Sequence, residues 1–575
     1  MTLNASLDTM QNDQPDPQLA QEAIELAARL LRSAQAAQTS SEKAQAGKIA
    51  GMMTDTNGKM LTIALSDQAF RSHDPARIAD QIRYLLDQYG VPQYFSWWER
   101  AALRWGAETA RFLPSLVVPL IVARLRQETQ NVILPSEEDA FKRYLRTRRG
   151  DQTRLNINQL GEAILGEGEA RRRLDAYLGL LARPDVEYIS VKISSVFSRI
   201  NLVAFDETVE AIKVRLRELY RSAMQHTFMT PDGRQVPKFV NLDMEEYRDL
   251  HLTVAAFKDV LSEDEFKSYR AGLVLQAYLP DSSPVQRDLT AWAQERVQQG
   301  GAPIKVRVVK GANFAMEQVE ASWHGWELAP YRTKTEVDAN FKRMVTYGCV
   351  PERAQAVNLG IASHNLFDVA YGLLLQERYG LHDTVEFEML EGMANHQARA
   401  VQDKANGLLL YAPIVKREDF HSAIAYLVRR LDENTAEENF LHDLFDLDVG
   451  GPAWEKQKNL FLDAYEQMHT VGDAPQRQQD RNTEQITFDP DAPFHNEPDT
   501  DFSLRQNSRW VCDIRDAWRD KLENNAIEDI PLQIGGQFIS GERMGEGNDP
   551  SRPHESAYRY ALATPQQVEQ ALSVA

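Results

Sequence analysis

The sequence has little cysteine and a shortage of basic residues, and both facts exclude classes of function. Cys349 and Cys512 are its only cysteines in 575 residues, too few for a disulfide framework or a cysteine-based structural zinc site. Its 64 Lys and Arg face 84 Asp and Glu, giving a formal net charge of -20. Nucleic acid is bound by basic surfaces. We therefore expect no nucleic-acid partner and no metal site.

Long apolar runs are also missing. The most apolar stretch, residues 112–122, is interrupted by Pro114 and Pro119 and is too short to span a bilayer. Burial inside the protein is the default interpretation of this run. Residues 1–17 are polar and acidic, unlike a signal peptide. The chain is predicted to be cytoplasmic, with a peripheral contact to the inner membrane face left open.

Up to about residue 150 the sequence is helical in pattern. Apolar residues recur at a spacing of 3.6, as in residues 78–88 and 97–112. We interpret Trp97, Trp98 and Trp105 as packing anchors and predict a helical N-terminal domain over residues 1–150.

From residue 155 onward, short strand-like runs alternate with amphipathic segments. Eight such units favour a (βα)8 barrel over an open sheet, so the fold class is α/β with a barrel over residues 151–465. The expected strands are residues 155–160, 186–194, 239–243, 273–279, 304–312, 357–363, 385–390 and 408–414. Chemistry in such a barrel lies at the C-terminal ends of the strands.

Polar residues gather at those strand ends. They include Lys192, Asp243, Gln276, Arg307, Lys310, His364 and Tyr411. One such residue alone is more often structural than catalytic, but their repetition over most of the eight strands is hard to ascribe to packing. Arg307 has barrel-facing parity, and an unpaired guanidinium is costly to bury there. We expect its partner to be an anionic or electron-rich edge of a cofactor.

Residues 425–434 form an apolar helical segment with two adjacent arginines. Glu433 follows Arg429 by four positions and Arg430 by three, so the three side chains share a helix face. An exposed salt-bridge surface, which contributes little to stability, is one interpretation. The other is an anion clamp, because paired guanidiniums bind a carboxylate through bidentate charge-assisted hydrogen bonds.

The barrel region offers little support for hydrolysis or metal catalysis. It has no Ser-His-Asp arrangement, no His/Cys cluster and no Gly-x-Gly-x-x-Gly loop. One group of basic side chains suits a phosphorylated cofactor: Arg307, Lys310, Lys334 and His364. Another suits a small carboxylate: Lys192, Arg429 and Arg430. Redox chemistry by a bound cofactor needs only such positioning from the protein.

Four motifs, in this order, resemble the proline dehydrogenase domain of the bacterial proline utilization A (PutA) family. They are residues 191–194, 306–312, 363–365 and 426–434, and the resemblance runs from about Leu155 to Asn434. It implies an FAD-binding barrel that oxidises L-proline to 1-pyrroline-5-carboxylate and passes the electrons to a membrane quinone. It also implies a helical domain before the barrel and an NAD-dependent aldehyde dehydrogenase domain after it.

The resemblance further implies roles for single residues. The catalytic set is Lys192, Asp243, Tyr411, Arg429, Arg430 and Glu433. The proline carboxylate and ring are assigned to Lys192, Leu390, Tyr411, Arg429 and Arg430. FAD is assigned to Asp243, Gln276, Arg307, Val309, Lys310, Gly311, Ala312, Lys334, Ser363, His364, Asn365, Leu390 and Glu433. A hydride would pass from C5 of proline to N5 of the flavin; no base is assigned, and Asp243 is expected to bond near Tyr411.

The sequence departs from the family pattern in two places. Asn313 and Phe314 stand where the family commonly has two aromatics, which affects a packing contact with the substrate, and the loop over residues 414–423 is longer than usual. The N-terminus lacks the basic pattern of the DNA-binding family members, so a repressor role is not expected. The oligomeric state is left open.

Residues 466–528 are predicted to be a linker, and residues 529–575 resemble the opening of an aldehyde dehydrogenase domain. Thr564 and Pro565 suit the N-cap and first residue of a helix. Nothing after Cys512 supplies the nucleophile of such an enzyme, so we expect NAD-dependent semialdehyde oxidation only in a longer protein.

Two alternatives to a proline dehydrogenase stay open. One is a non-catalytic flavin barrel that binds a small carboxylate as a sensor or scaffold. The other is a different flavin barrel, such as a folate reductase, which would respond to NADH instead of proline and would lack the paired arginines.

Overall fold

The chain forms two compact units. One comprises Met1–Asn201 and Asp206–Arg477, and the other Leu202–Phe205 and Gln478–Ala575. The computed structural model describes residues 16–44, 47, 51, 55–65, 68, 72, 74–129, 133–151, 153–161, 164, 166–405, 407–416, 423, 426, 439–444, 447–484, 491, 493–524 and 526–575.

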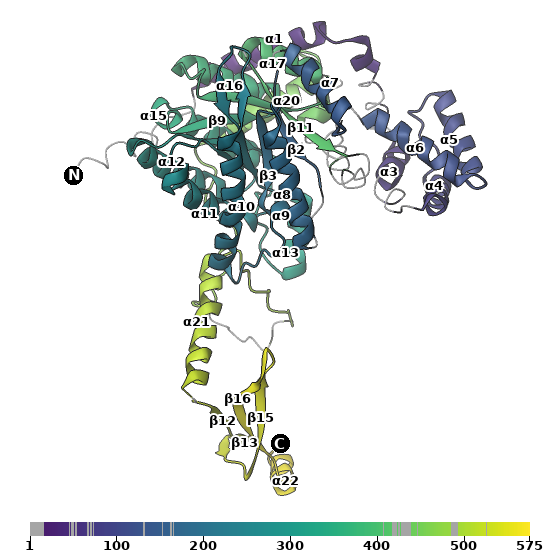
Figure 1. The fold of residues 1–575 in the computed structure, drawn as a ribbon. Coiled ribbons are helices and arrows are strands. Elements are labelled where there is room, and N and C mark those ends of the chain that lie inside the picture. The colour runs from purple at the N-terminus through teal and green to yellow at the C-terminus, as the bar shows by residue number, and fades with distance from the viewer. Residues whose placement is uncertain are drawn as a thin grey trace. The chain divides into compact units, whose positions relative to one another are not determined.

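Eight parallel strands of the first unit close into a barrel (Figure 1). The last strand pairs with the first in a register that runs from Leu409 opposite Arg154 to Ile414 opposite Gln159. The strands are β2 (Arg154–Gln159), β3 (Tyr188–Lys192), β6 (Phe239–Asp243), β7 (Gly272–Gln276), β8 (Ile304–Val309), β9 (Val357–Ala362), β10 (Val385–Leu390) and β11 (Leu409–Val415). All eight predicted strands are confirmed. A short strand, β1 (Leu134–Pro135), extends the end of β11.

Helices surround these strands, as Figure 1 shows for α8, α10, α11, α12 and α16. Nearly all residues of the strands are buried, as expected for parallel strands covered by helices on one face and filled by side chains on the other. The helices are α8 (Glu167–Ala182), α9 (Ile193–Val196), α10 (Phe205–Gln225), α11 (Asp249–Leu261), α12 (Ser282–Gln298), α13 (Phe314–His324), α14 (Lys334–Gly348), α15 (Pro351–Ala354), α16 (Leu366–Tyr379), α17 (Asn395–Ala405), α19 (Phe440–Asp443) and α20 (Pro452–Gln467). A 3-10 turn, Asp264–Phe266, follows α11, and a hairpin of β4 (Thr227–Met229) and β5 (Gln235–Pro237) follows α10.

Capping residues fix where two helices beside the site begin. Thr333 and Glu336 form a capping box at the start of α14, and the Asn365 side chain accepts the Phe367 N–H at the start of α16. These bonds satisfy backbone N–H groups that have no partner within the helix. The start of α16, directly after β9, and the start of α14, which follows β8 and α13, are therefore fixed.

Two helices from outside the barrel repeat cover its outer layer. Helix α1 (Pro17–Ala36) packs against α16 and α17 through a row of buried alanines and leucines. Helix α20 packs against α14 and α16, and Phe461 stacks on Phe367 with 5.7 Å between ring centroids. Aromatic pairs of this kind add to the stability gained from burial.

Helices α3 to α6 form a small cluster with its own core, which includes Leu61, Ile82, Leu85 and Val118. The helical patterns predicted over residues 78–88 and 97–112 are confirmed. These helices are α3 (Thr56–Ala64), α4 (Pro75–Tyr89), α5 (Trp97–Ala110) and α6 (Pro114–Thr129), and α7 (Glu138–Gly150) follows them before the barrel.

The burial expected for the aromatic residues of α5 is wrong. Trp97 is 79% exposed, Trp98 50% and Trp105 77%, because the cluster core uses the small residues Ala107 and Ala110 of this helix instead. Among residues 112–122, Val118 is buried, whereas Phe112, Leu116 and Leu120 are exposed.

The second unit holds a long helix and short strands. Its elements are α21 (Arg505–Glu523), β12 (Glu528–Ile530), β13 (Leu532–Ile534), β14 (Gln537–Ile539), β15 (Arg543–Asp549), β16 (Arg552–Leu562) and α22 (Pro565–Val574). The predicted cap is confirmed, because the Thr564 side chain accepts the Gln567 N–H at the start of α22. None of the residues of α22 is buried.

Throughout the described ranges, no helix has both the length and the apolar character that crossing a membrane requires.

Candidate active site

A cavity of about 340 Å³ lies at the C-terminal ends of the barrel strands. Fourteen of the residues that the sequence assigned to the site line it. They are Lys192, Asp243, Gln276, Arg307, Val309, Lys310, Gly311, Ala312, Lys334, Ser363, His364, Asn365, Leu390 and Tyr411. Most lie at or just beyond a strand end, whereas Arg307 and Tyr411 lie within β8 and β11, and Lys334 begins α14. Arg429, Arg430 and Glu433 lie outside the described residues, although Tyr426 from the same segment also lines the cavity.

Asp243, the last residue of β6, joins two other lining residues. Its Oδ2 accepts the Tyr411 hydroxyl at 2.8 Å, and its Oδ1 pairs with Nη2 of Arg307. The expected contact between Asp243 and Tyr411 is therefore confirmed. Burial and the nearby Asp243 carboxylate raise the pKa of Tyr411 well above its usual value, so the phenol stays neutral and acts as a donor.

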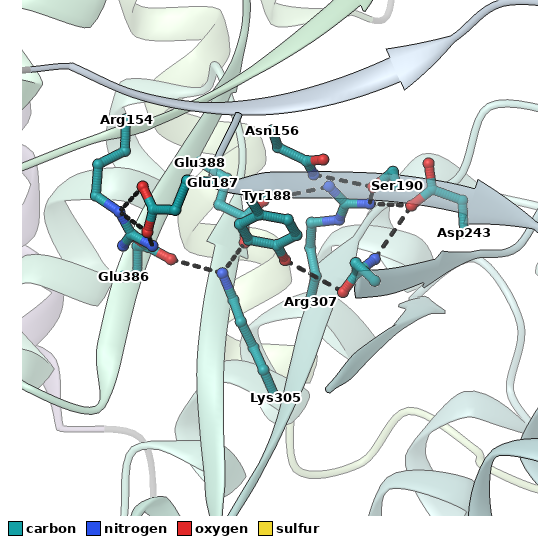
Figure 2. Close-up of polar contacts among 11 residues, drawn as sticks. Arg154, Asn156, Glu187, Tyr188, Ser190, Asp243, Lys305, Arg307, Glu386 and Glu388 are labelled. Atoms are coloured by element: carbon teal, nitrogen blue, oxygen red, sulfur yellow. Dashed lines mark hydrogen bonds and ion pairs between the residues drawn. The ribbon is translucent and has the colours of Figure 1, made fainter. Parts of the chain in front are cut away.

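Arg307 has partners within the protein, whereas the sequence led us to expect the edge of a cofactor as its partner. Besides Asp243, its guanidinium has Glu388 at 3.3 Å and the Ser190 hydroxyl at 3.2 Å. Figure 2 shows these partners around the guanidinium. Strand alternation predicted the inward direction of Arg307, but the sequence did not indicate that β6 and β10 would supply carboxylates at the same depth.

Two side chains that line the cavity keep unused hydrogen-bonding capacity. The Gln276 amide donates to the carbonyls of Met244 and Glu245, at 3.2 and 3.3 Å. Within the described part of the chain, its buried Oε1 and the buried Nε of Arg307 have no hydrogen-bond partner. Such atoms carry a desolvation cost until a ligand or water satisfies them.

Lys192, at the end of β3, forms an ion pair with Glu245. Both residues line the cavity, and both side chains are only partly buried. The ammonium is thus held at the wall of the cavity by a carboxylate that is itself within reach of a ligand.

Lysines and aspartates form a buried cluster beside the cavity, and two of its lysines, Lys310 and Lys334, line it. Lys310 pairs with Asp338 at 2.6 Å and with Asp368 at 2.7 Å. Lys334 pairs with Asp338, and Lys342 with Asp368. Three cations therefore share two carboxylates. Burial and the neighbouring Lys310 outweigh Asp338 and lower the pKa of Lys334, as expected where positive charge is in excess.

Ser363, His364 and Asn365 follow β9 and have local partners. The Ser363 hydroxyl donates to Asp368 at 3.4 Å, and the His364 Nε2 accepts the Leu390 N–H at 3.0 Å. Since Asn365 caps α16, this turn directs the start of that helix toward the cavity lining. Helix starts of this kind favour anions.

Gly311 allows the chain to pass close to an aromatic ring. Its φ is +121°, and a Cβ at this position would lie 2.5 Å from the Tyr278 ring. A side chain here would clash with that ring and adopt a strained backbone angle. The backbone of residues 309–312 can therefore line the cavity directly.

Sequence reasoning missed several residues of this cavity. Asn158 donates to the Tyr411 hydroxyl, Glu245 pairs with Lys192, and Glu388 pairs with Arg307. Strand alternation could have indicated Glu388, because it follows Glu386 by two positions on β10. The other lining residues are Met244, Val274, Asn313, Ala362, Met389 and residues 439–441.

Comparison with known proteins points to one family. A family model described as proline dehydrogenase matches residues 141–443. The bifunctional protein PutA of Escherichia coli (strain K12) is 28% identical over 319 residues, which cover 51% of this chain and 22% of that protein. The chain thus matches only about a fifth of the length of this curated relative.

Two solved structures are also similar. Proline utilization A from Corynebacterium freiburgense is 40% identical over 72% of this chain and 38% of that chain, with a TM-score of 0.58. Proline utilization A from Bdellovibrio bacteriovorus, inactivated by N-propargylglycine, is 25% identical over 96% of this chain and 54% of that chain, with a TM-score of 0.75.

Proposed function

Because this chain belongs to the proline dehydrogenase family, we propose that its barrel oxidises L-proline to 1-pyrroline-5-carboxylate with FAD and passes the electrons to a quinone. The observation that carries the proposal is that one cavity gathers the fourteen described residues assigned from the family motifs. Independent packing needs would not bring residues from six strands and the segments that follow them to one cavity.

The chemistry of the lining supports FAD as the cofactor. Gln276 and Arg307 offer an unsatisfied acceptor and donor, respectively, to the polar edge of a flavin ring. The excess cation among Lys310, Lys334 and Lys342, together with the start of α16, suits the phosphate groups. Gly311 and Ala312 offer backbone with little or no side chain, since a Cβ at Gly311 would clash with the Tyr278 ring.

When bound, FAD would supply the two-electron oxidation by accepting hydride from C5 of proline. The chain's own residues would bind and orient the substrate. Lys192 would hold the carboxylate together with Arg429 and Arg430, and Glu433 would orient these arginines. Tyr411, held by Asp243, would pack with Leu390 around the ring.

The substrate nitrogen must lose its proton before the hydride leaves, so that its lone pair stabilises the developing iminium. We assign no side chain as the base and propose that the deprotonated form of proline is selected on binding. The electron acceptor is proposed to be a membrane quinone reached by a transient peripheral contact.

Steady-state turnover tests the proposal. Purified protein with L-proline and a soluble quinone analogue should reduce the quinone and release 1-pyrroline-5-carboxylate, which o-aminobenzaldehyde traps as a coloured adduct. Binding of proline without product would favour a sensor or scaffold. Reduction of the flavin by NADH, with no response to proline, would favour a different flavin barrel.

A further inference from the structure

This inference rests on the proposed function and concerns Glu388 in the cavity lining and the lysine behind it. We propose that Lys305 and Glu388 form a positioning pair that sets the orientation and effective charge of Arg307, and through it the reduction potential of the bound flavin. Lys305 is not among the described residues that line the cavity, so it would act on the flavin only through its partners.

A continuous chain of ion pairs crosses the barrel interior (Figure 2). Lys305 Nζ lies 2.6 Å from Glu386 Oε2 and 2.6 Å from Glu388 Oε1. The other oxygen of Glu388 faces Arg307 Nη1 at 3.3 Å, and Arg307 continues to Asp243. At the far end, Glu386 pairs with Arg154.

Strand geometry makes this chain possible. Lys305 and Arg307 are two positions apart on β8 and point to the same side, into the barrel. Glu386 and Glu388 have the same relationship on β10. The strand between them, β9, has Gly360 at the crossing point. A Cβ on Gly360 would lie 2.9 Å from Lys305 Cε and would also clash with the Glu388 carboxylate.

Glu388 is therefore shared between two cations. Lys305 is 4% and Glu388 2% exposed at the side chain, so their interaction is only weakly screened by solvent. Burial alone would lower the pKa of Lys305, but Glu386 and Glu388 outweigh burial and raise it. The lysine thus stays charged. It binds Oε1 of Glu388, so that only Oε2 of this carboxylate faces Arg307.

The consequence for a flavin beside Arg307 has a definite sign. Reduction adds negative charge to the flavin, and any nearby uncompensated positive charge stabilises the reduced form. Without Lys305, the whole Glu388 carboxylate is available to neutralise Arg307, and the potential should fall. Without the Glu388 charge, Arg307 and Lys305 are less compensated, and the potential should rise.

Two variants with opposite expected shifts test this inference. In full-length flavin-loaded protein, Lys305→Met should lower the midpoint potential, and Glu388→Gln should raise it. Each shift should correspond to at least a tenfold change in the reduction equilibrium, which is ~30 mV for a two-electron couple. The double variant removes the ion pair as a neutral unit, so its potential should return toward the wild-type value.

The double variant also keeps the test decisive if one single variant does not fold, because breaking one partner of a buried pair costs more than removing both. Lys238→Met is the matched control. Lys238 is a buried lysine directly before β6 that does not line the cavity. It donates to the Arg183 and Val186 carbonyls, and its loss should leave the potential unchanged.

Midpoint potentials that shift in the same direction in both single variants would overturn the inference, as would unchanged potentials in both. A double variant whose potential differs from wild type by as much as that of either single variant would also overturn it. These results are distinct from a failure of the proposed function. In that case the wild-type protein itself would bind no flavin or would not be reduced by proline, and both proposals would fall.

Discussion

The Tyr411 hydroxyl and the Asp243 carboxylate are joined by a hydrogen bond of 2.8 Å between the eighth and third strands of the barrel. The other oxygen of Asp243 holds Arg307. One carboxylate thus fixes a residue proposed to contact the substrate and another proposed to contact the flavin. The Arg307 guanidinium pairs with the negative charge of this carboxylate, and the Tyr411 hydroxyl donates to one of its oxygens.

Asp243→Asn tests this relationship. The amide keeps the shape but loses the charge, and hydrogen bonds to charged groups contribute about 1.5–3 kcal/mol. We expect kcat/KM for proline to fall at least about tenfold. Asp281→Asn is the control, because Asp281 accepts the Tyr247 hydroxyl in a similar buried pair at 3.2 Å without lining the cavity. Equal losses in both variants would point to general destabilisation.

The pairing of Lys192 with Glu245 leads to a second prediction. Lys192→Met removes a cation proposed to bind the substrate carboxylate, so the KM for proline should rise at least about tenfold with little change in flavin content. Lys258→Met removes a lysine paired with Asp288 on the outer helices, at 2.8 Å, and should leave KM unchanged. A wild-type KM in the Lys192 variant would remove this residue from the proposed substrate site.

A third prediction concerns the two arginines that lie outside the described residues. Changing either Arg429 or Arg430 to Met should reduce kcat/KM for proline at least about tenfold, because each is proposed to make charge-assisted bonds to the carboxylate. Flavin content should stay the same. Wild-type proline kinetics in an Arg430→Met protein would favour the interpretation as an exposed salt-bridge surface.

Asp249 gives the stability of the fold a predicted pH dependence. Burial, with a smaller contribution from Glu246, raises the pKa of this carboxyl to about 7. The folded state therefore holds a proton that the unfolded state releases near pH 4. The free energy of unfolding should fall as pH rises from about 4 to about 7 and then level off.

Asp249→Asn should remove this fall in the free energy of unfolding with rising pH. Relative to wild type, the variant should gain stability between pH 5 and pH 8, by at most ~3 kcal/mol, measured by urea unfolding at both pH values. Asp259→Asn changes a half-exposed aspartate on the same helix and should show no such gain. A stability difference independent of pH would contradict the assignment to Asp249.

The sequence predicted the barrel well because its signals are local and repeated. Each strand is a short apolar run, and the bounds predicted for β6 and β10 agree with the structure. The resemblance in motifs then identified fourteen residues that line one cavity in the structure. Both signals depend on the spacing of residues along the chain, and the sequence gives that spacing directly.

Contacts between side chains of strands that are distant in the sequence could not be predicted from this spacing. The pairing of Arg307 with Asp243 and Glu388 depends on the depth at which β6, β8 and β10 meet, which strand parity alone does not give. The exposure of Trp97 and Trp105 has a similar origin. Helical periodicity marks an apolar face, but it does not indicate whether alanines or tryptophans meet the neighbouring helices.

The spectrum of the purified protein under anaerobic conditions tests the central claim most directly. The account predicts an oxidised flavin spectrum that bleaches when L-proline is added and returns when a quinone analogue is supplied. A protein without flavin, or a flavin that stays oxidised in excess L-proline, would contradict it.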